Sequence, residues 1–308
     1  MEKLVIIDGN AIVHRAYHAL PPMSTQDGQP TNAVYGFFSM LLKLLSDLNP
    51  KYLIVCFDRA KPTFRKQLYV GYQATRPKMS DDLVPQMSLV HKVLDEAKIA
   101  HFGIDGYEAD DLIGSFSKQS KELNLETIIV TGDRDLLQLV NSKVKVLAPI
   151  LGITKMVLYD EEKVEEKYGL KTSQFIDYKA LVGDASDNYP GVSGIGPKTA
   201  SQLLKKYGDF ENLYTHISEL PENLSIKLAQ DAEQAALAKK LATIVTDAPV
   251  KLELEKVETD KLDKKGLLKA FEELGFKSLI VRVTGRVEEK DDVKEEPKDK
   301  KTDQLELI

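Results

Sequence analysis

Apolar runs alternate with amphipathic stretches through the first half of the chain. Residues 4–8 and 52–58 are short apolar runs, and each ends in an aspartate. Between them, residues 32–48 carry apolar side chains at helical spacing. The apolar stripe consists of Phe37, Leu41, Leu44, Leu45 and Leu48. Strands that alternate with helices predict a mostly parallel α/β sheet.

The same patterning predicts the remaining elements. In the first half we expect two further helices, at residues 82–98 and 108–123, and two further strands, at 126–131 and 143–147. From about residue 160 the pattern is helical, with candidates at 161–168, 172–182, 198–207 and 231–245. A late helical pair, 265–274 and 278–283, is expected to fold back on the sheet.

Acidic residues gather in three short motifs. The motifs are Gly106-Tyr-Glu-Ala-Asp-Asp111, Thr131-Gly-Asp-Arg-Asp135 and Gly183-Asp-Ala-Ser-Asp187. Sites in parallel sheets lie at the carboxyl ends of the strands. Because Asp8, Asp58 and Asp133 fall at or just past such ends, we expect the acidic residues to share one cleft.

The acidic set is a candidate metal site. It comprises Asp8, Asp58, Glu108, Asp110, Asp111, Asp133, Asp135, Asp184 and Asp187. Two bare charges about 4 Å apart repel by roughly 1 kcal/mol in water and about 4 kcal/mol at an effective dielectric near 20, so a cation is expected among them. Hard oxygen ligands without histidine or cysteine favour Mg²⁺ or Mn²⁺. Two such ions roughly 3.5–4 Å apart would hydrolyse a phosphodiester. The alternative is that these residues cap helices and turns or are solvated.

Positive charge is concentrated in residues 59–78, which hold six basic side chains and no acidic one. The aromatic residues Phe64, Tyr69 and Tyr72 lie among these cations, and aromatic rings can stack on unpaired bases. The formal net charge of -6 argues weakly against nucleic acid. The local distribution argues for a nucleic-acid enzyme, and a solvated charged face is the alternative.

A glycine-paced segment, Gly191-Val-Ser-Gly-Ile-Gly-Pro-Lys-Thr-Ala200, enters the predicted helix at 198–207. Gly194 and Gly196 permit close backbone approach, and amides at a helix start can hold a phosphate oxygen. With the preceding helix it predicts a helix–hairpin–helix that contacts the DNA backbone, not the base sequence. A plain turn between two helices is the alternative. Lys198, Lys205 and Lys206 add positive charge.

The remaining composition is that of an ordinary globular protein, with 43% hydrophobic and 29% charged residues. Cys56 is the single cysteine, lies in an apolar run and is expected to pack in the core of a protein of the reducing cytoplasm. We expect no signal peptide and no membrane span. The five histidines show no ligand spacing and are interpreted as surface or packing residues.

Residues 286–301 are almost wholly charged, and this composition predicts disorder because too little apolar surface is available to offset the ordering entropy. The chain then ends in Gln304-Leu-Glu-Leu-Ile308.

Together these motifs resemble the 5′-nuclease domain of bacterial DNA polymerase I and the wider flap endonuclease family, from about residue 3 to about residue 284. The resemblance rests on the acidic motifs, the hairpin and four shorter runs: Ile7-Asp-Gly-Asn10, Ala33-Val-Tyr-Gly36, Val55-Cys-Phe-Asp58 and Phe64-Arg65. It implies a PIN-like, mostly parallel sheet core with a helical arch, and a helical helix–hairpin–helix DNA-binding region. The implied divisions are a catalytic core at 1–170 with the arch at about 60–85, a DNA-binding region with C-terminal helices at 171–285, and a charged tail at 286–308.

The resemblance also implies roles for single residues. Asp8, Asp58, Glu108 and Asp110 would bind a first Mg²⁺ (or Mn²⁺), and Asp133, Asp135 and Asp187 a second, with Asp111 and Asp184 shared between the ions or just behind their ligands. Arg15, Tyr72 and Arg76 would contact the 5′ end and the scissile phosphate. The residues expected to bind DNA are Arg65, Lys66, Lys78, Gly191, Gly194, Gly196, Lys198 and Thr199. The hairpin would also bind K⁺.

Two features depart from the family pattern. The family usually has lysine after the arch tyrosine, and here Gln73 follows Tyr72. The chain also ends after the charged tail without a polymerase, which we expect to mean a standalone nuclease. Its last residues resemble the short motif by which bacterial replication proteins bind the sliding clamp, through Gln304, Leu305, Leu307 and Ile308, with isoleucine in place of the usual final phenylalanine.

The resemblance therefore predicts a monomeric, Mg²⁺-dependent 5′→3′ exonuclease and 5′-flap endonuclease. Its expected substrates are DNA with 5′ flaps or nicks and RNA primers, in replication and repair. Two alternatives stay open. One is a PIN-type ribonuclease, and the other is a catalytically weak adaptor that binds DNA junctions or the sliding clamp.

Overall fold

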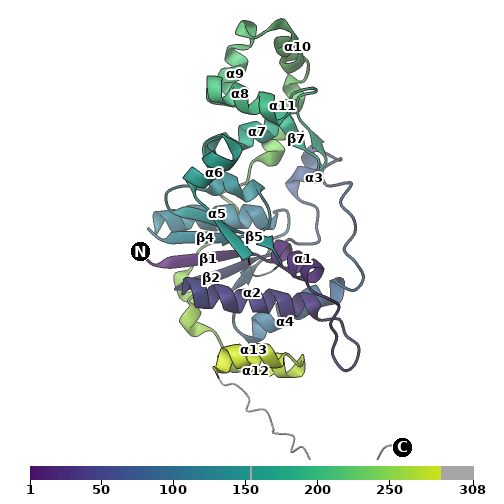
Figure 1. Ribbon diagram of the computed structural model, residues 1–308, viewed down its shortest axis with the longest axis vertical. Helices are drawn as coiled ribbons and strands as arrows, with labels where there is room; N and C mark the ends of the chain where they lie inside the picture. The colour runs from purple at the N-terminus through teal and green to yellow at the C-terminus, as the bar shows by residue number, and fades with distance from the viewer. Residues whose placement is uncertain (153–154, 286–308) are drawn as a thin grey trace, which may run out of the picture.

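A six-stranded sheet forms the centre of the molecule (Figure 1). The structure is a computed structural model, and it describes residues 1–152 and 155–285. The strands are β1 (Lys3–Asp8), β2 (Tyr52–Cys56), β3 (His101–Phe102), β4 (Glu126–Val130), β5 (Val144–Leu151) and β6 (Lys155–Tyr159), in the order β3-β2-β1-β4-β5-β6. Neighbouring strands are parallel except for β6, which runs antiparallel to β5. The mostly parallel sheet is confirmed, and β6 was not predicted.

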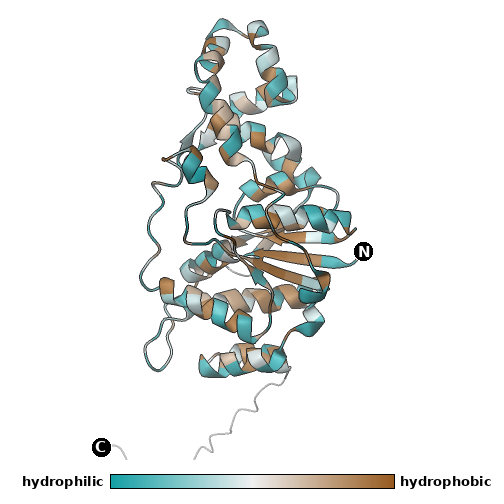
Figure 2. Cartoon of the chain, turned by 180° about the vertical axis from the view of Figure 1, so that it is seen from behind, coloured by the Kyte–Doolittle hydropathy of each residue, from teal (hydrophilic) through white to brown (hydrophobic). Residues whose placement is uncertain are grey.

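Both faces of the sheet are covered, which explains why its central strands are continuously apolar. Val5 and Ile7 point into the core on one side, and Leu4 and Ile6 into the core on the other. The first side is packed by α1 (Gly9–Ala19), α2 (Asn32–Leu48) and α4 (Val84–Glu96), and the second by α5 (Ala109–Glu122). Figure 2 shows the apolar strands enclosed between amphipathic helices.

The C-terminal helical pair, α12 (Lys264–Glu273) and α13 (Lys277–Thr284), corrects one expectation. The pair does not lie on the sheet. It packs on α2 and α4 and forms a third layer at the end of the molecule opposite the helical region (Figure 1). The rings of Phe38 and Phe271 join the layers at 5.6 Å. The reason is that α1, α2 and α4 already occupy that face of the sheet.

The helical region at the other end has its own apolar core. Its helices are α7 (Phe175–Val182), α8 (Pro197–Tyr207), α9 (Phe210–Thr215), α10 (Glu222–Gln230) and α11 (Ala232–Ala242), and α6 (Glu161–Tyr168) before them packs Val164 into the core on the sheet. A two-stranded ribbon of β7 (Gly183–Asp184) and β8 (Tyr189–Pro190) joins α7 to the glycine-rich hairpin. Short 3₁₀ turns lie at Asp135–Leu139, Thr172–Gln174, Ile217–Glu219, Leu254–Lys256 and Thr259–Lys261.

The segment predicted as an arch connects the two ends. Its only helix among the described residues is α3 (Phe64–Leu68), which lies near β7 and α11. Residues 69–83 then run along the edge of the molecule down to α4 (Figure 1). Val70 in this segment is 90% exposed, whereas Tyr72 and Leu83 are buried and anchor the segment to the rest of the molecule.

Two sequence predictions are limited by the described range. The predictions of a disordered tail and of a clamp-binding motif fall on residues 286–308, which lie outside the described residues. Across the part of the chain that the structure describes, every helix is too short or too polar to cross a membrane.

Candidate active site

The carboxyl ends of β1, β2 and β4 bring three acidic segments together. Asp8 ends β1 and caps α1, accepting a hydrogen bond from the amide of Ala11 at 3.0 Å. Its second oxygen accepts from the hydroxyl of Thr131, just past β4, at 2.7 Å. Asp58 follows β2 and accepts from the amide of Ala109 at 2.8 Å, which fixes the start of α5 beside the strand ends.

The start of α5 supplies two more carboxylates. Glu108 is the residue before the helix, and its carboxylate accepts hydrogen bonds from the hydroxyls of Thr63 at 2.9 Å and Tyr72 at 3.1 Å. Asp110 lies in the first turn. We call Asp8, Asp58, Glu108 and Asp110 the first carboxylate group. Its members come from three separate elements, and the shared cleft predicted from the strand ends is where they meet.

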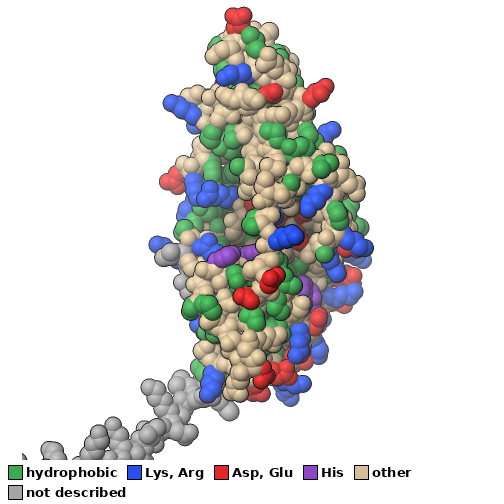
Figure 3. All heavy atoms as spheres, turned by 90° about the vertical axis from the view of Figure 1, so that its right-hand side faces the viewer, with side chains coloured by type: hydrophobic (Ala, Val, Ile, Leu, Met, Phe, Trp, Pro, Cys, Tyr) green, Lys and Arg blue, Asp and Glu red, His purple; other side chains and the backbone are tan. Residues whose placement is uncertain are grey.

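This group lines an open cavity of about 1170 Å³. The acidic residues on the cavity wall are the first carboxylate group with Asp133 and Asp187. The basic side chains on the wall are His14, Arg15, His18, Arg59, Lys61, Lys66 and Arg76. Figure 3 shows the side of the molecule along which residues 69–83 run, where lysine and arginine side chains are spread and histidines reach the surface near mid-height. A cavity with acidic and basic walls suits a metal-dependent enzyme that acts on phosphate esters.

Burial and mutual repulsion raise the pKa values of the carboxylates in the first group. Burial, with the negative charges of Asp58 and Asp133, raises the pKa of Asp8 to about 7. Burial, followed by the charge of Asp133, raises the pKa of Asp110 well above its ordinary value. Among the described residues, no lysine or arginine forms an ion pair with Asp8, Asp58, Asp110 or Asp133. A bound divalent ion would relieve this repulsion.

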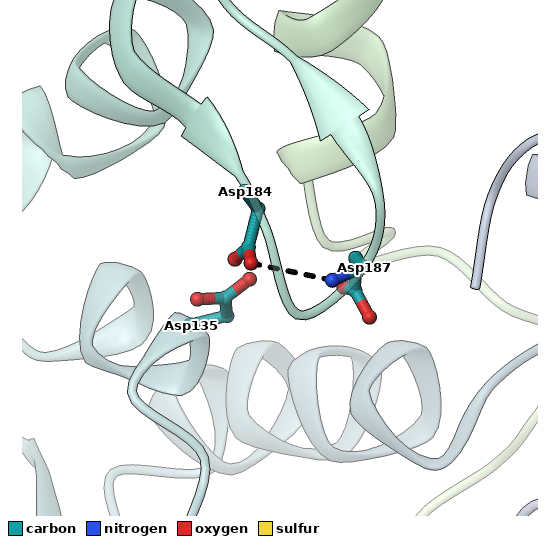
Figure 4. A group of neighbouring side chains, drawn as sticks. All are labelled: Asp135, Asp184 and Asp187. Atoms are coloured by element: carbon teal, nitrogen blue, oxygen red, sulfur yellow. Dashed lines mark hydrogen bonds between the residues drawn. The ribbon is translucent and has the colours of Figure 1, made fainter. Parts of the chain in front are cut away.

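Asp135, Asp184 and Asp187 form a second carboxylate group (Figure 4). One oxygen of each lies within 4.8 Å of the others. Asp184 and Asp187 flank the tight turn of the β7–β8 ribbon, and the amide of Asp187 donates to Asp184 at 3.3 Å. Asp133 links the two groups, because its carboxylate accepts from the amide of Asp135 at 2.8 Å. All the candidate ligands are carboxylate oxygens, so the residues present fit Mg²⁺ or Mn²⁺.

Lys179 lies in the second carboxylate group and was not among the predicted site residues. Its ammonium contacts Asp135 at 2.6 Å and also donates to Asp184. Burial raises the pKa of Asp135 to about 7 despite this lysine. Burial acts in the same direction on Asp184, but the bonds from Lys179 and Ser186 outweigh it and lower the pKa of Asp184. The sequence spacing gave no signal for Lys179, because its role depends on where the ribbon folds back.

Tyr72, Gln73 and Arg76 connect the arch to the acidic groups. The hydroxyl of Tyr72 contacts Glu108 at 3.1 Å and Asp187 at 3.3 Å, and its ring is buried rather than open to a base. The guanidinium of Arg76 pairs with Asp187 at 2.7 Å, and the amide of Gln73 donates to the carbonyl of Asp187 at 2.8 Å. The arch and the second carboxylate group are therefore directly bonded to one another.

Arg65 corrects one prediction. It was expected to bind DNA, but its side chain is buried and donates two hydrogen bonds of 2.8 Å to the buried carboxylate of Asp111. Asp111 was expected to be shared between the ions or to lie just behind their ligands. Asp111 also accepts from the amides of Glu108 and Val245. With its oxygens occupied in this way, Asp111 is a structural partner of Arg65, and neither residue faces the cavity.

The glycine-rich hairpin lies between α7 and α8 as predicted. Gly194 has φ +72°, which L side chains adopt only with strain. The backbone amides of Gly194 and Gly196 donate to no acceptor in residues 1–152 and 155–285, and both glycines are exposed. Gly191 differs, because it is buried and a Cβ there would lie 2.3 Å from the amide nitrogen of Gly183. Gly191 therefore allows the close approach of the backbone at Gly183 where β7 pairs with β8, which corrects its assignment to DNA contact.

The other predicted contacts divide by location. Lys198 is exposed and Thr199 half-buried in the first turn of α8, beside the hairpin. Lys66 and Arg15 line the cavity, and the Nε of Arg15 donates to the carbonyl of Gly152 at 2.9 Å. Lys78 is exposed but is not on the cavity wall.

The histidines were interpreted as surface or packing residues, and two of them lie on the surface of the candidate site. His14 and His18 lie one turn apart on α1 and both line the cavity. Burial, with the nearby charges of His18 and Arg76, lowers the pKa of His14. Their position next to Arg15 on the helix that Asp8 caps was the available signal.

Family models match most of the chain. A 5′-3′ exonuclease N-terminal resolvase-like domain matches residues 3–169, and a 5′-3′ exonuclease C-terminal SAM fold matches residues 170–265.

Sequence relatives divide into long and short proteins. DNA polymerase I of Caldicellulosiruptor bescii is 44% identical over 91% of this chain, and that of Bacillus subtilis is 41% identical over 92%. The aligned part is 33% and 32% of those proteins, so the chain spans about a third of their length. A 5′-3′ exonuclease of Aquifex aeolicus is 38% identical over 92% of this chain and 96% of its own length.

Solved structures share the fold. The T5 5′-exonuclease with bound divalent metal ions (zinc) has a TM-score of 0.66 and 21% identity, covering 92% of this chain and 98% of its own. The catalytic core of Rad2 in complex with DNA substrate has a TM-score of 0.59 and 17% identity, covering 92% of each chain.

Proposed function

Since the chain belongs to the 5′-3′ exonuclease family, we propose that it is a divalent-metal-dependent 5′→3′ exonuclease and 5′-flap endonuclease. The observation that carries this proposal is a cavity lined by the first carboxylate group, Asp133 and Asp187 that also has a basic wall, with Asp135 and Asp184 beside Asp187. The flap specificity is supported by the shared fold with a solved phage T5 flap endonuclease, at 21% identity and a TM-score of 0.65.

The two carboxylate groups supply the ligands for the proposed ions. The first group would hold one Mg²⁺ or Mn²⁺ and the second group another, with Asp133 between them. Bound together, two such ions activate water and neutralise charge on the attacked phosphate and the leaving oxygen. The oxygen-only donor set supports Mg²⁺ over zinc, which favours nitrogen and sulfur ligands.

The chain's own cations would place the phosphate. Arg76 is half-exposed at the cavity and pairs with Asp187, so a phosphate entering there would compete for the same guanidinium. Lys66 and Arg15 lie on the cavity wall and offer further contacts to the 5′ strand. Tyr72 is buried, and its hydroxyl holds Glu108 and Asp187 in place rather than stacking on a base.

The hairpin would hold the duplex. The free amides of Gly194 and Gly196 point to a phosphate contact at the start of α8, and Lys198 adds positive charge there. K⁺ at this hairpin is also proposed. The Nζ of Lys227 lies 3.4 Å from the carbonyl of Gly194, so K⁺ binding would require this ammonium to move.

The biological setting is a further part of the proposal. RNA primers and displaced 5′ flaps are the substrates that such a nuclease removes in replication and repair, and the enzyme would act as a monomer. We also propose that Gln304, Leu305, Leu307 and Ile308 bind a sliding clamp, on their sequence alone. Deletion of residues 304–308 should abolish clamp binding in surface plasmon resonance and leave flap cleavage unchanged; clamp binding that survives the deletion contradicts this part.

The experiment that tests the main proposal is cleavage of a labelled double-flap DNA under single-turnover conditions. The wild-type protein is measured with Mg²⁺ and with EDTA, and Asp133→Asn with Mg²⁺. Release of the 5′ flap near the junction, abolished by EDTA and strongly reduced in the variant, supports the proposal. Asp209→Asn, which changes an aspartate that caps α9 far from the cavity, is the matched control and should cleave like the wild type.

Two other outcomes correspond to the alternatives. Faster cleavage of a matched RNA flap than of the DNA flap would favour a PIN-type ribonuclease. Tight binding to the junction without cleavage under Mg²⁺ or Mn²⁺ would favour the adaptor.

A further inference from the structure

Lys179 places a positive charge inside the second carboxylate group. The side chain is 16% exposed, and its ammonium lies 2.6 Å from Asp135 while also donating to Asp184. Lys179 comes from the last turn of α7, and Asp184 from the ribbon that follows directly. The chain's path from helix to ribbon thus brings the lysine back onto the acidic residues.

The two carboxylate groups differ in how they are neutralised. In the first group, Glu108 is the one member that forms an ion pair within residues 1–152 and 155–285, with the guanidinium of Arg65 at 3.5 Å. In the second group every carboxylate has a close cationic partner among the described residues. Lys179 forms ion pairs with Asp135 and Asp184, and Arg76 forms an ion pair with Asp187 at 2.7 Å. The second group therefore carries most of its compensating charge within the protein.

Both carboxylate oxygens of Asp184 are already engaged in hydrogen bonds. One oxygen of Asp184 accepts from the amide of Ser186 at 2.7 Å and from the amide of Asp187, and the other accepts from Lys179. An ammonium and a divalent ion cannot occupy the same side of these carboxylates, because like charges so close repel strongly. An ion can enter between Asp135 and Asp184 only if the lysine leaves.

We propose that Lys179 is a built-in counter-ion that competes with the second divalent ion. This inference rests on the proposed function, which assigns the second carboxylate group to a metal. Lys179 holds Asp135 and Asp184 together while the site is without metal, and it withdraws as the ion binds. The first ion therefore binds tightly and the second binds weakly, so the two sites fill in that order.

The test is a Mn²⁺ titration followed by electron paramagnetic resonance, with the full chain and no DNA. The wild type should show one tight and one weak site. Lys179→Met removes the charge, and it should tighten the second site at least about tenfold while leaving the first unchanged. A second site of unchanged or weaker affinity in this variant would overturn the inference.

Three further variants keep the result interpretable. Lys179→Gln also removes the charge while keeping a polar end, and it should give the same tightening if Lys179→Met folds poorly. Lys179→Arg keeps the charge and should leave the second site weak. The matched control is Lys239→Met, because Lys239 likewise bridges two carboxylates, Asp177 and Glu211, each at 2.7 Å and outside the acidic groups. Tightening in the control equal to that in Lys179→Met would contradict a local effect.

Failure of this inference and failure of the proposed function are distinguishable, since the titration contains no substrate. Flap cleavage with equal Mn²⁺ affinities in wild type and Lys179→Met would overturn the role of Lys179 alone. The expected shift in Mn²⁺ affinity without any flap cleavage would support the role of Lys179 and overturn the nuclease activity.

Discussion

The guanidinium of Arg65 and the carboxylate of Asp111 form a buried, bidentate ion pair, with both hydrogen bonds at 2.8 Å. The Nε of Arg65 donates to the carbonyl of Leu241 and a second nitrogen donates to that of Thr243. One pair thus ties α3 to the start of α5 and to the end of α11. Because Glu108 is bonded to Asp111 through its amide, the pair also fixes a residue of the first carboxylate group.

Arg65→Met should lower the free energy of unfolding by about 3–5 kcal/mol, because it leaves the Asp111 carboxylate buried without its partner. Urea unfolding followed by circular dichroism measures this. Lys66→Met is the matched control, since Lys66 is the next residue on the same helix and is exposed. Equal losses in the two variants, or none in Arg65→Met, would contradict a structural role for the pair.

Asp110→Asn should have a higher melting temperature than the wild type in EDTA, and this difference should disappear in Mg²⁺. Burial and the charge of Asp133 raise the pKa of Asp110 in the folded protein, so the unfolded chain ionises more easily. The destabilisation by this charge is therefore absent below the pKa of Asp110 in the unfolded chain. It grows as the pH rises from that value through the higher pKa of Asp110 in the folded protein. The stabilisation of the variant in EDTA should be larger at about pH 8 than at about pH 5.

Differential scanning fluorimetry across this pH range measures the effect. Asp177→Asn is the control, because Asp177 is buried but paired with Lys239 at 2.7 Å, so its replacement should destabilise with or without metal. A lower melting temperature for Asp110→Asn in EDTA at pH 8 would count against repulsion in the first carboxylate group.

Gly194→Ala should weaken binding to duplex DNA roughly tenfold, since a side chain at φ +72° distorts the hairpin amides that are proposed to face a phosphate. Fluorescence anisotropy with a labelled nicked duplex measures the change. Gly208→Ala imposes a comparable strain at φ +89° after α8, away from the hairpin, and should lower stability without changing DNA affinity. Equal DNA affinities for Gly194→Ala and wild type would exclude the hairpin as a contact.

Gln73→Lys should increase the single-turnover rate on a flap. Gln73 lines the cavity between Tyr72 and the segment that carries Arg76, and a lysine there would add a cation near the phosphate. Gln73 has φ +53°, a strain that glutamine and lysine share, so the substitution should leave stability nearly unchanged. A rate equal to or below that of the wild type, with an unchanged melting temperature, would show that the missing charge is not limiting.

The sequence predicted the sheet well because local patterns determine its elements. The apolar run before Asp8 is strand β1, and the helix expected at residues 32–48 is α2 with those bounds. The family resemblance inferred from the acidic motifs is confirmed by the family models. Strand ends also placed Asp8, Asp58 and Asp133 on a common cleft, because parallel strands end at the same edge of a sheet.

The main errors share one physical cause, which is long-range contact. A basic residue in a charged segment is normally predicted to be solvent-exposed. No residue near Arg65 in the sequence indicates that its side chain will be buried against Asp111 and the carbonyl of Leu241. Lys179 was missed for the same reason, since its partner Asp135 lies far from it in the sequence. The helical pair at residues 264–284 was predicted to pack on the sheet, but α2 and α4 cover that face of the sheet, so the pair packs on those helices instead.

The measurement that tests the account most directly is an anomalous diffraction map of the protein crystallised with Mn²⁺ and an uncleavable 5′-flap DNA. The account predicts one manganese peak among Asp8, Asp58, Glu108 and Asp110, and a second beside Asp135, Asp184 and Asp187 with the Lys179 ammonium displaced. A scissile phosphate next to these peaks would connect the ions to flap hydrolysis. Absence of manganese at the first carboxylate group, with DNA bound in the cavity, would contradict the central claim.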